Sequence, residues 1–165
     1  MGLLENFDYY FVGITTGKAR ENMILTAKGN AFYPHELVHK LLPENKNRGH
    51  IIEEGLAEFL GTKINFEAYE KSRLQFATDL KLNKKVNFKI GIVSQEVIFI
   101  GYQTAYPSGA AICELVYNKK GDKGLLQLMS ANTKEYNDLI LTLMDITKLS
   151  LDEIIEEWNK LVLKE

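Results

Sequence analysis

One segment of the chain places two histidines and a glutamate at a spacing that suits a metal ion. His35-Glu36-Leu37-Val38-His39 has the form H-E-x-x-H and lies where the apolar pattern predicts a helix. Residues four apart on a helix differ by about 40° around the axis and lie about 6 Å apart along it, so both imidazoles can reach one zinc ion at about 2.0–2.1 Å. Glu36 is turned about 100° from His35, so it can stand beside the ion and take a proton from an acidified water. The pentapeptide also occurs by chance in unrelated sequences, so it is not sufficient alone.

A carboxylate on a second predicted helix supplies a candidate third ligand. The elongated motif with a third histidine is absent, because that position is Asn45. The segment Ile52–Glu58 follows a proline-terminated turn, and an antiparallel return would bring it back beside the first helix. Glu54 shares a helical face with Glu58, whereas Glu53 lies about 100° away. The alternative is that these three glutamates form a solvated acidic face.

These motifs together resemble those of the gluzincins, which are zinc metallopeptidases with an HExxH…E ligand set, and in particular the small bacterial peptidase MA-like domains. The similar segments are HELVH and EEGLAEFLG, and the likeness extends over about residues 23–163. In that family the glutamate before the glycine of E-G-x-A is the third zinc ligand, which implies Glu54. Some relatives have a carboxylate one turn later that orients a ligating histidine, which implies this role for Glu58. A salt bridge from Glu58 to Lys63 is the alternative.

Two further segments resemble substrate-binding parts of the family. Tyr102–Ala111 is similar to a Y-x-x-G stretch before an apolar helix, and this likeness implies that Tyr106 donates a hydrogen bond to the oxyanion of the reaction. A core tyrosine at the start of that helix is the alternative. In relatives an edge strand pairs with the extended substrate, and an ordinary internal strand is the alternative here. The residues implied in this strand are Met23, Ile24, Leu25, Thr26 and Ala27.

Composition and charge exclude several classes of protein. The 165 residues are 45% hydrophobic and 25% charged, which is typical of a globular domain rather than a disordered chain. Twenty Lys+Arg against 22 Asp+Glu give a net charge of -2, so we expect no nucleic-acid partner. No apolar run reaches the roughly 20 residues of a transmembrane segment. The single cysteine, Cys113, excludes an internal disulfide and a cysteine-based zinc site, and we expect it to be a core thiol.

The patterning predicts an α+β fold that is predominantly helical. We expect a zincin-like metallopeptidase core as a single domain over residues 1–165, with zinc in a cleft between a small N-terminal sheet and a helical C-terminal lobe. Residues 1–30 are expected to be strand-rich, residues 31–82 to hold the active-site helices, and residues 83–165 to form the mostly helical lobe. Expected strands lie at 8–13, 23–27, 86–90 and 96–100. Expected helices lie at 30–42, 51–60, 66–82, 106–117, 125–129 and 132–143, and a final one begins at a capping box at Ser150 and carries Trp158.

The sequence therefore predicts a zinc-dependent peptidase that hydrolyses a peptide or an unfolded protein segment. Zn²⁺ would be bound by His35, His39 and Glu54, with Glu36 as general base. The alternatives are a catalytically degenerate zincin that binds a protein or peptide without cutting it, and a metal-free helical interaction module. Residues 1–5 lack the basic segment of a signal peptide, but a shortened precursor of an extracytoplasmic bacterial protein would look the same, so the sequence assigns no location.

Overall fold

The computed structural model of the chain describes residues 13–15, 24–26, 34–62, 73–74, 76–78, 81, 88–89, 98–99, 102–103 and 105–163. The long elements are helices: α1 (Pro34–Leu41), α2 (His50–Thr62), α5 (Ala105–Ser130), α6 (Tyr136–Thr147) and α7 (Leu151–Leu163). Residues 73–74, 76–78, 81 and 88–89 are also helical. Strands β1 (Gly13–Thr15) and β2 (Ile24–Thr26) form one antiparallel pair, and β3 (Ile98–Phe99) and β4 (Tyr102–Gln103) form another.

The described residues form a helical fold, so the expected α+β class with an N-terminal sheet lobe is wrong. Their β structure is limited to the two separate pairs, with three and two residues per strand. Isolated two-stranded pairs of this kind are marginal by themselves, so they cannot form a lobe with its own core. Residues 88 and 89 are helical rather than part of the strand expected at 86–90. A short apolar run of this kind cannot be distinguished from a buried helical segment by its period.

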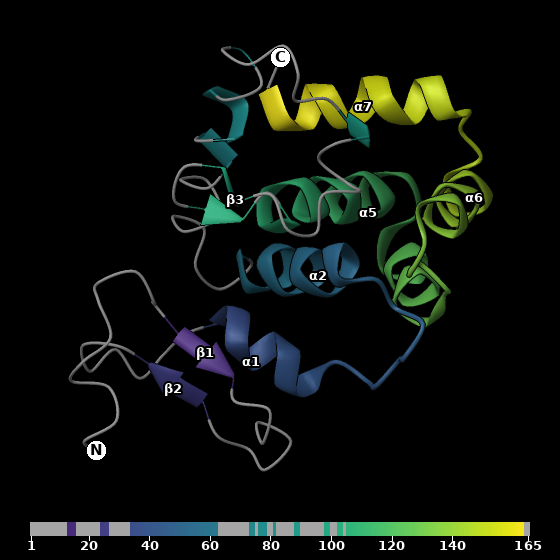
Figure 1. The fold of residues 1–165 in the computed structure, drawn as a ribbon. Helices are drawn as coiled ribbons and strands as arrows, with labels where there is room; N and C mark the ends of the chain where they lie inside the picture. The colour runs from purple at the N-terminus through teal and green to yellow at the C-terminus, as the bar shows by residue number, and fades with distance from the viewer. Residues whose placement is uncertain are drawn as a thin grey trace.

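The helices are arranged as a stack. Figure 1 shows α1, α2, α5 and α7 lying one upon the next, with α6 beside α5 and α7 and seen nearly end-on. The core is formed by the faces that α2, α5, α6 and α7 turn toward one another. Its largest fully buried side chains include Ile52, Leu56, Ile112, Leu115, Leu139, Leu143, Ile154 and Trp158. Among the described residues, no helix combines the length and the apolar character that crossing a membrane requires.

Trp158 of α7 is buried in the core and joins α7 to α5. Its side chain is 0% exposed, and its indole N–H donates to the carbonyl oxygen of Ser108 at 3.2 Å. The rings of Phe76 and Phe88 meet it edge-on. Cys113 is also buried, as expected, and burial raises the pKa of its thiol. Both residues therefore belong to the core rather than to a site.

Some of the helix ends lie where the sequence predicts them. The capping box that opens α7 is confirmed, because Glu153 accepts a hydrogen bond from the backbone N–H of Ser150 at 2.8 Å and its own N–H meets Ser150 Oγ at 3.4 Å. The N-cap of α6 is Glu135, so this helix begins at Tyr136 rather than at residue 132 as expected. The helices expected at 106–117 and 125–129 are the two parts of α5, and they meet at a kink where the backbone of Gly121 is not helical (φ 59°, ψ -152°).

Close backbone contacts set the spacing of the helices that carry the site. A methyl group on Gly55 of α2 would overlap the backbone of Gly109 of α5. A methyl group on Gly61 would lie 3.1 Å from the backbone nitrogen of His35, tighter than ordinary van der Waals contact. Glycine at these two positions therefore lets α2 lie against α5 on one side and α1 on the other.

The loop between α1 and α2 is bound to the C-terminal end of α5. Asn45 and Arg48 both donate hydrogen bonds to the carbonyl oxygen of Met129, with distances of 2.8–3.1 Å. The backbone N–H of Gly49 donates to Thr133 Oγ1 at 3.0 Å. Asn45, where the elongated motif would place a histidine, therefore has a structural role. These bonds hold the tight return that brings α2 alongside α1.

Candidate metal centre

Side chains from α1 and α2 meet at one point between the two helices. His35 Nε2 lies 3.1 Å from His39 Nε2 and 3.1 Å from Glu54 Oε2, and His39 Nε2 lies 3.3 Å from the same oxygen. The two histidines stand on consecutive turns of α1, and Glu54 reaches them from the first half of α2. The antiparallel return expected from the sequence thus brings His35, His39 and Glu54 together.

The triangle formed by these three atoms has the size of a zinc site. Donor atoms at the corners of a tetrahedron with bonds of about 2.0–2.1 Å are about 3.3–3.4 Å apart. The observed edges of 3.1, 3.1 and 3.3 Å differ from this by a few tenths of an ångström. Two imidazoles and one carboxylate are also a ligand set found in catalytic zinc sites, which keep a fourth position for water or substrate. The donor set therefore fits zinc in both distance and chemistry.

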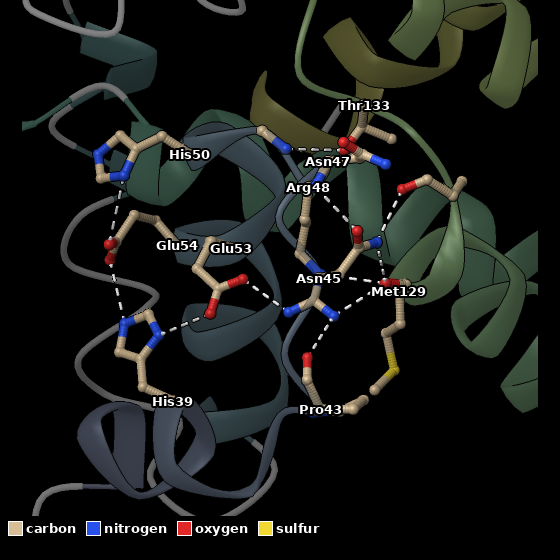
Figure 2. Close-up of polar contacts among 12 residues, drawn as sticks. His39, Pro43, Asn45, Asn47, Arg48, His50, Glu53, Glu54, Met129 and Thr133 are labelled. Carbon is tan, nitrogen blue, oxygen red and sulfur yellow. Dashed lines mark hydrogen bonds and ion pairs between the residues drawn. The ribbon is translucent and has the colours of Figure 1, made fainter. Parts of the chain in front are cut away.

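Each of the three side chains has a partner on the atom that faces away from the triangle. His35 Nδ1 donates to Glu58 Oε2 at 3.0 Å, which is the contact implied for Glu58 by the family resemblance. His39 Nδ1 lies 3.6 Å from Glu53 Oε1, and Glu54 Oε1 lies 3.6 Å from His50 Nδ1 (Figure 2). Such outer partners orient metal ligands. Lys63, the alternative partner of Glu58, lies outside the described residues.

The two histidines of this cluster cannot both carry a proton on the nitrogen that faces the other ring. Burial lowers the pKa of both histidines, but the neighbouring glutamates outweigh it and raise both, that of His39 to about 9. Burial would raise the pKa of Glu54, yet the two histidines outweigh it and lower the pKa to about 2. However, the two Nε2 atoms are 3.1 Å apart, so two imidazolium ions would direct N–H groups at each other. A cation that accepts both lone pairs removes this conflict.

Glu36 lies buried beside the histidines with an incompletely bonded carboxylate. It follows His35 on α1, and its side chain is only 7% exposed. Its Oε2 atom is buried and makes no hydrogen bond to the residues that the structure describes. A buried carboxylate oxygen without a partner is costly in a purely structural residue. A general base, in contrast, needs an oxygen that is free to bond a reacting water.

Tyr106 enters the same site from a third helix. It is the second residue of α5, and its half-buried ring meets the ring of His35 edge-on with centroids 5.1 Å apart. The close approach of Gly109 to Gly55, described above, holds this end of α5 against α2. The structure thus brings the expected tyrosine next to the candidate metal ligands.

The residues expected to bind substrate as an edge strand are only partly described. Ile24, Leu25 and Thr26 form β2, which pairs antiparallel with β1, and β1 in turn contacts α1. Met23 and Ala27 lie outside the described residues. The strand expected at 23–27 is therefore found over residues 24–26, and its role in binding substrate stays a prediction.

Arg48 is a residue of this site that the sequence did not identify. Its side chain is 1% exposed and its Nη1 donates to Glu53 Oε2 at 2.6 Å (Figure 2). A second acceptor that fixes it, the carbonyl of Met129, lies 81 positions further along the chain. The only local signal is an acid five residues after an arginine, which is common on protein surfaces. The tertiary contact is what makes Arg48 part of the site.

Comparison with known proteins gave no match among family models, curated proteins or solved structures. The likeness to gluzincins therefore remains an interpretation of the sequence motifs.

Proposed function

We propose that the protein is a zinc-dependent peptidase. The observation that carries the proposal is the triangle formed by His35, His39 and Glu54, with edges of 3.1–3.3 Å. It is supported by the buried, incompletely bonded carboxylate of Glu36, which a purely structural metal site does not require.

His35, His39 and Glu54 would hold the ion. When bound, zinc acts as a Lewis acid that lowers the pKa of water and polarises a carbonyl group. Glu58 keeps the proton of His35 on Nδ1, so that Nε2 presents its lone pair to the site. The chain's own contribution is thus a fixed set of three donors from two helices.

Two side chains of the protein act on the substrate. Glu36 accepts a proton from the attacking water as the new C–O bond forms, and delivers that proton to the leaving amine as the C–N bond breaks. Tyr106 donates a hydrogen bond from its neutral phenol to the carbonyl oxygen, on which negative charge develops. Substrate in this proposal is a peptide or an unfolded protein segment, because the reaction needs an accessible backbone carbonyl.

The test combines metal content with turnover. Purified protein should bind one equivalent of zinc, and a mixed peptide library should be cleaved at new amino termini detectable by mass spectrometry. Glu36→Gln should retain zinc and lower kcat by about 10²- to 10⁴-fold, since general-base catalysis contributes about that much. Glu156→Gln, an exposed change on α7, is the matched control and should leave both unchanged.

Two outcomes would contradict the proposal. Zinc binding without cleavage of any peptide by the wild type, and without an effect of Glu36→Gln, would favour a peptide-binding zincin. Absence of zinc by elemental analysis, with no effect of chelators on the melting temperature, would favour a metal-free helical module.

A further inference from the structure

A buried arginine lies behind the candidate metal centre. Arg48 donates from Nε and Nη2 to the carbonyl oxygen of Met129 at 3.1 and 2.8 Å, and from Nη2 to that of Pro43 at 2.9 Å. These bonds fix the guanidinium plane between the α1–α2 loop and the end of α5. The remaining terminal nitrogen, Nη1, donates to Glu53 Oε2 at 2.6 Å. Arg48 therefore has one fixed orientation and fixes one oxygen of Glu53.

The other oxygen of Glu53 faces His39. Glu53 Oε1 lies 3.6 Å from His39 Nδ1, which is an ion-pair distance rather than a hydrogen bond. His39 Nε2, on the opposite side of the ring, lies 3.1 Å from His35 Nε2 and 3.3 Å from Glu54 Oε2. Figure 2 shows the resulting chain of contacts from Met129 through Arg48 and Glu53 to His39.

We propose that Arg48 and Glu53 are positioning residues for His39. Arg48 holds the Glu53 carboxylate in place, and the negative charge of this carboxylate, 3.6 Å from His39 Nδ1, favours the tautomer that has its proton on Nδ1 and its Nε2 lone pair directed at the cluster. The inference rests on the proposed function, because it treats His39 Nε2 as a metal ligand.

Both members of the pair are needed for this effect. Guanidinium has donors only, so any acceptor at position 53 must turn an oxygen toward Arg48. A glutamate has a second oxygen left for His39, whereas a glutamine has only an amide NH₂ group left. Outer partners of metal-bound histidines typically change metal affinity by about 10- to 100-fold.

Glu53→Gln tests the proposal with a nearly isosteric change. The Gln oxygen should bond Arg48, so its NH₂ group should face the Nδ1–H of His39, donor against donor. We expect zinc affinity, measured by competition with a chromophoric chelator, to fall about 10- to 100-fold. The double variant Arg48→Met/Glu53→Gln frees the amide to turn its oxygen toward His39. It should therefore recover several-fold in zinc affinity over Glu53→Gln alone, which a merely structural role would not produce.

Glu156→Gln, which breaks an exposed ion pair with Lys160, is the matched control and should bind zinc as the wild type does. Melting curves show whether each variant is folded at the assay temperature. Zinc affinity unchanged by Glu53→Gln, or a double variant that binds more weakly than the single one while folded, would overturn the positioning role. If the double variant does not fold, the single variant decides. A wild-type chain that binds no zinc would overturn the proposed function instead.

Discussion

Glu54 has a carboxylate that lies close to three histidines. Its two oxygens lie 3.1 Å from His35, 3.3 Å from His39 and 3.6 Å from His50. Burial favours its neutral form, but the neighbouring histidines outweigh this effect and lower the pKa of Glu54 to about 2. It therefore remains a carboxylate throughout the pH range in which proteins work. This carboxylate also attracts protons to the histidines when no cation is present.

The metal-free protein should become less stable as the pH rises through the range in which His39 titrates. Burial lowers the pKa of His39, but Glu53 and Glu54 outweigh it and raise the pKa from 6.5 to about 9. The folded state therefore binds this proton more tightly than the unfolded state does. The resulting stabilisation is fully present below about pH 6.5 and is lost as the pH rises to about 9.

Thermal melting in the presence of a chelator measures this effect. The melting temperature should fall between about pH 6.5 and pH 9, and His39→Gln should flatten that part of the profile. A wild-type profile that is flat or rises over this range would contradict the assignment of His39 as the titrating group.

These side chains also show how much of the site the sequence reveals. The spacing of His35 and His39 is sufficient to place both on one face of a helix, and the position of Glu54 follows from an antiparallel return. Arg48 and its contact with Met129 could not be predicted, because they depend on how the end of α5 meets the α1–α2 loop. The period of apolar residues shows which side chains share one face of a helix. It does not show which distant carbonyl group will lie against that face.

The glycine contact between α2 and α5 determines where Tyr106 lies. Gly55 and Gly109 pack backbone against backbone, so the start of α5 lies against the face of α2 next to Glu54. His35 and Tyr106 then come into ring contact at 5.1 Å. The position of the candidate oxyanion donor therefore depends on two residues without side chains.

Gly55→Ala should destabilise the protein by about 1–3 kcal/mol, the usual cost of adding a methyl group to a tightly packed contact. The added methyl would meet backbone atoms of Gly109, which cannot rotate away as a side chain can. Urea unfolding measures the loss. Asn118→Ala at an exposed position of α5 is the control and should change the free energy of unfolding by less than about 0.5 kcal/mol. A Gly55→Ala variant as stable as this control would contradict the packing argument.

Helices and the turn within α5 were easier to predict from the sequence than short apolar runs. The helices of the site, α1 and α2, lie within about four residues of their expected bounds, and α7 begins at its capping box. The bend of α5 was expected as a break, because Gly121 and Gly124 are typical of a turn. The strand expected at 86–90 was wrong at residues 88 and 89, which are helical, because a short apolar run looks the same in a strand and in a buried helical segment. Tertiary packing, rather than local preference, decides the structure of such a run.

The candidate metal centre and the hydrophobic core of the protein share one helix, α2. α2 presents Glu54 to α1 on one face and buries Ile52 and Leu56 on others. The three candidate ligands therefore come together only when α1 and α2 are packed. An unfolded chain would hold them apart and would bind a cation far more weakly.

Zinc should therefore raise the melting temperature of the wild-type protein. A ligand that binds only the folded state adds about 2.7 kcal/mol at one hundred times its Kd. Calorimetry with added zinc should show this shift, Glu36→Gln should retain it, and Glu54→Gln should lose it. Magnesium, which prefers six oxygen ligands, is the control and should have no effect. A zinc shift that persists in Glu54→Gln would contradict the assignment of Glu54 as a ligand.

The fold class was the least predictable property of the chain. Aromatic and β-branched runs near the N-terminus suggested a sheet lobe, whereas the described residues show two small strand pairs beside a stack of helices. A strand pattern indicates that a segment is extended, but not that enough partners exist to build a sheet with its own core.

α5 contacts His35 of the candidate metal centre near its start and binds Arg48, behind that centre, near its end. Tyr106 lies near its start, the carbonyl of Met129 near its finish, and Gly121 bends the helix between them. One residue inserted or deleted within either helical part of α5 would rotate the residues beyond it by about 100° around the axis of that part and shift them by about 1.5 Å. The number of residues between Tyr106 and Met129 is therefore constrained. Among descendants of this sequence, insertions and deletions in this helix should be rarer than substitutions on its outer face.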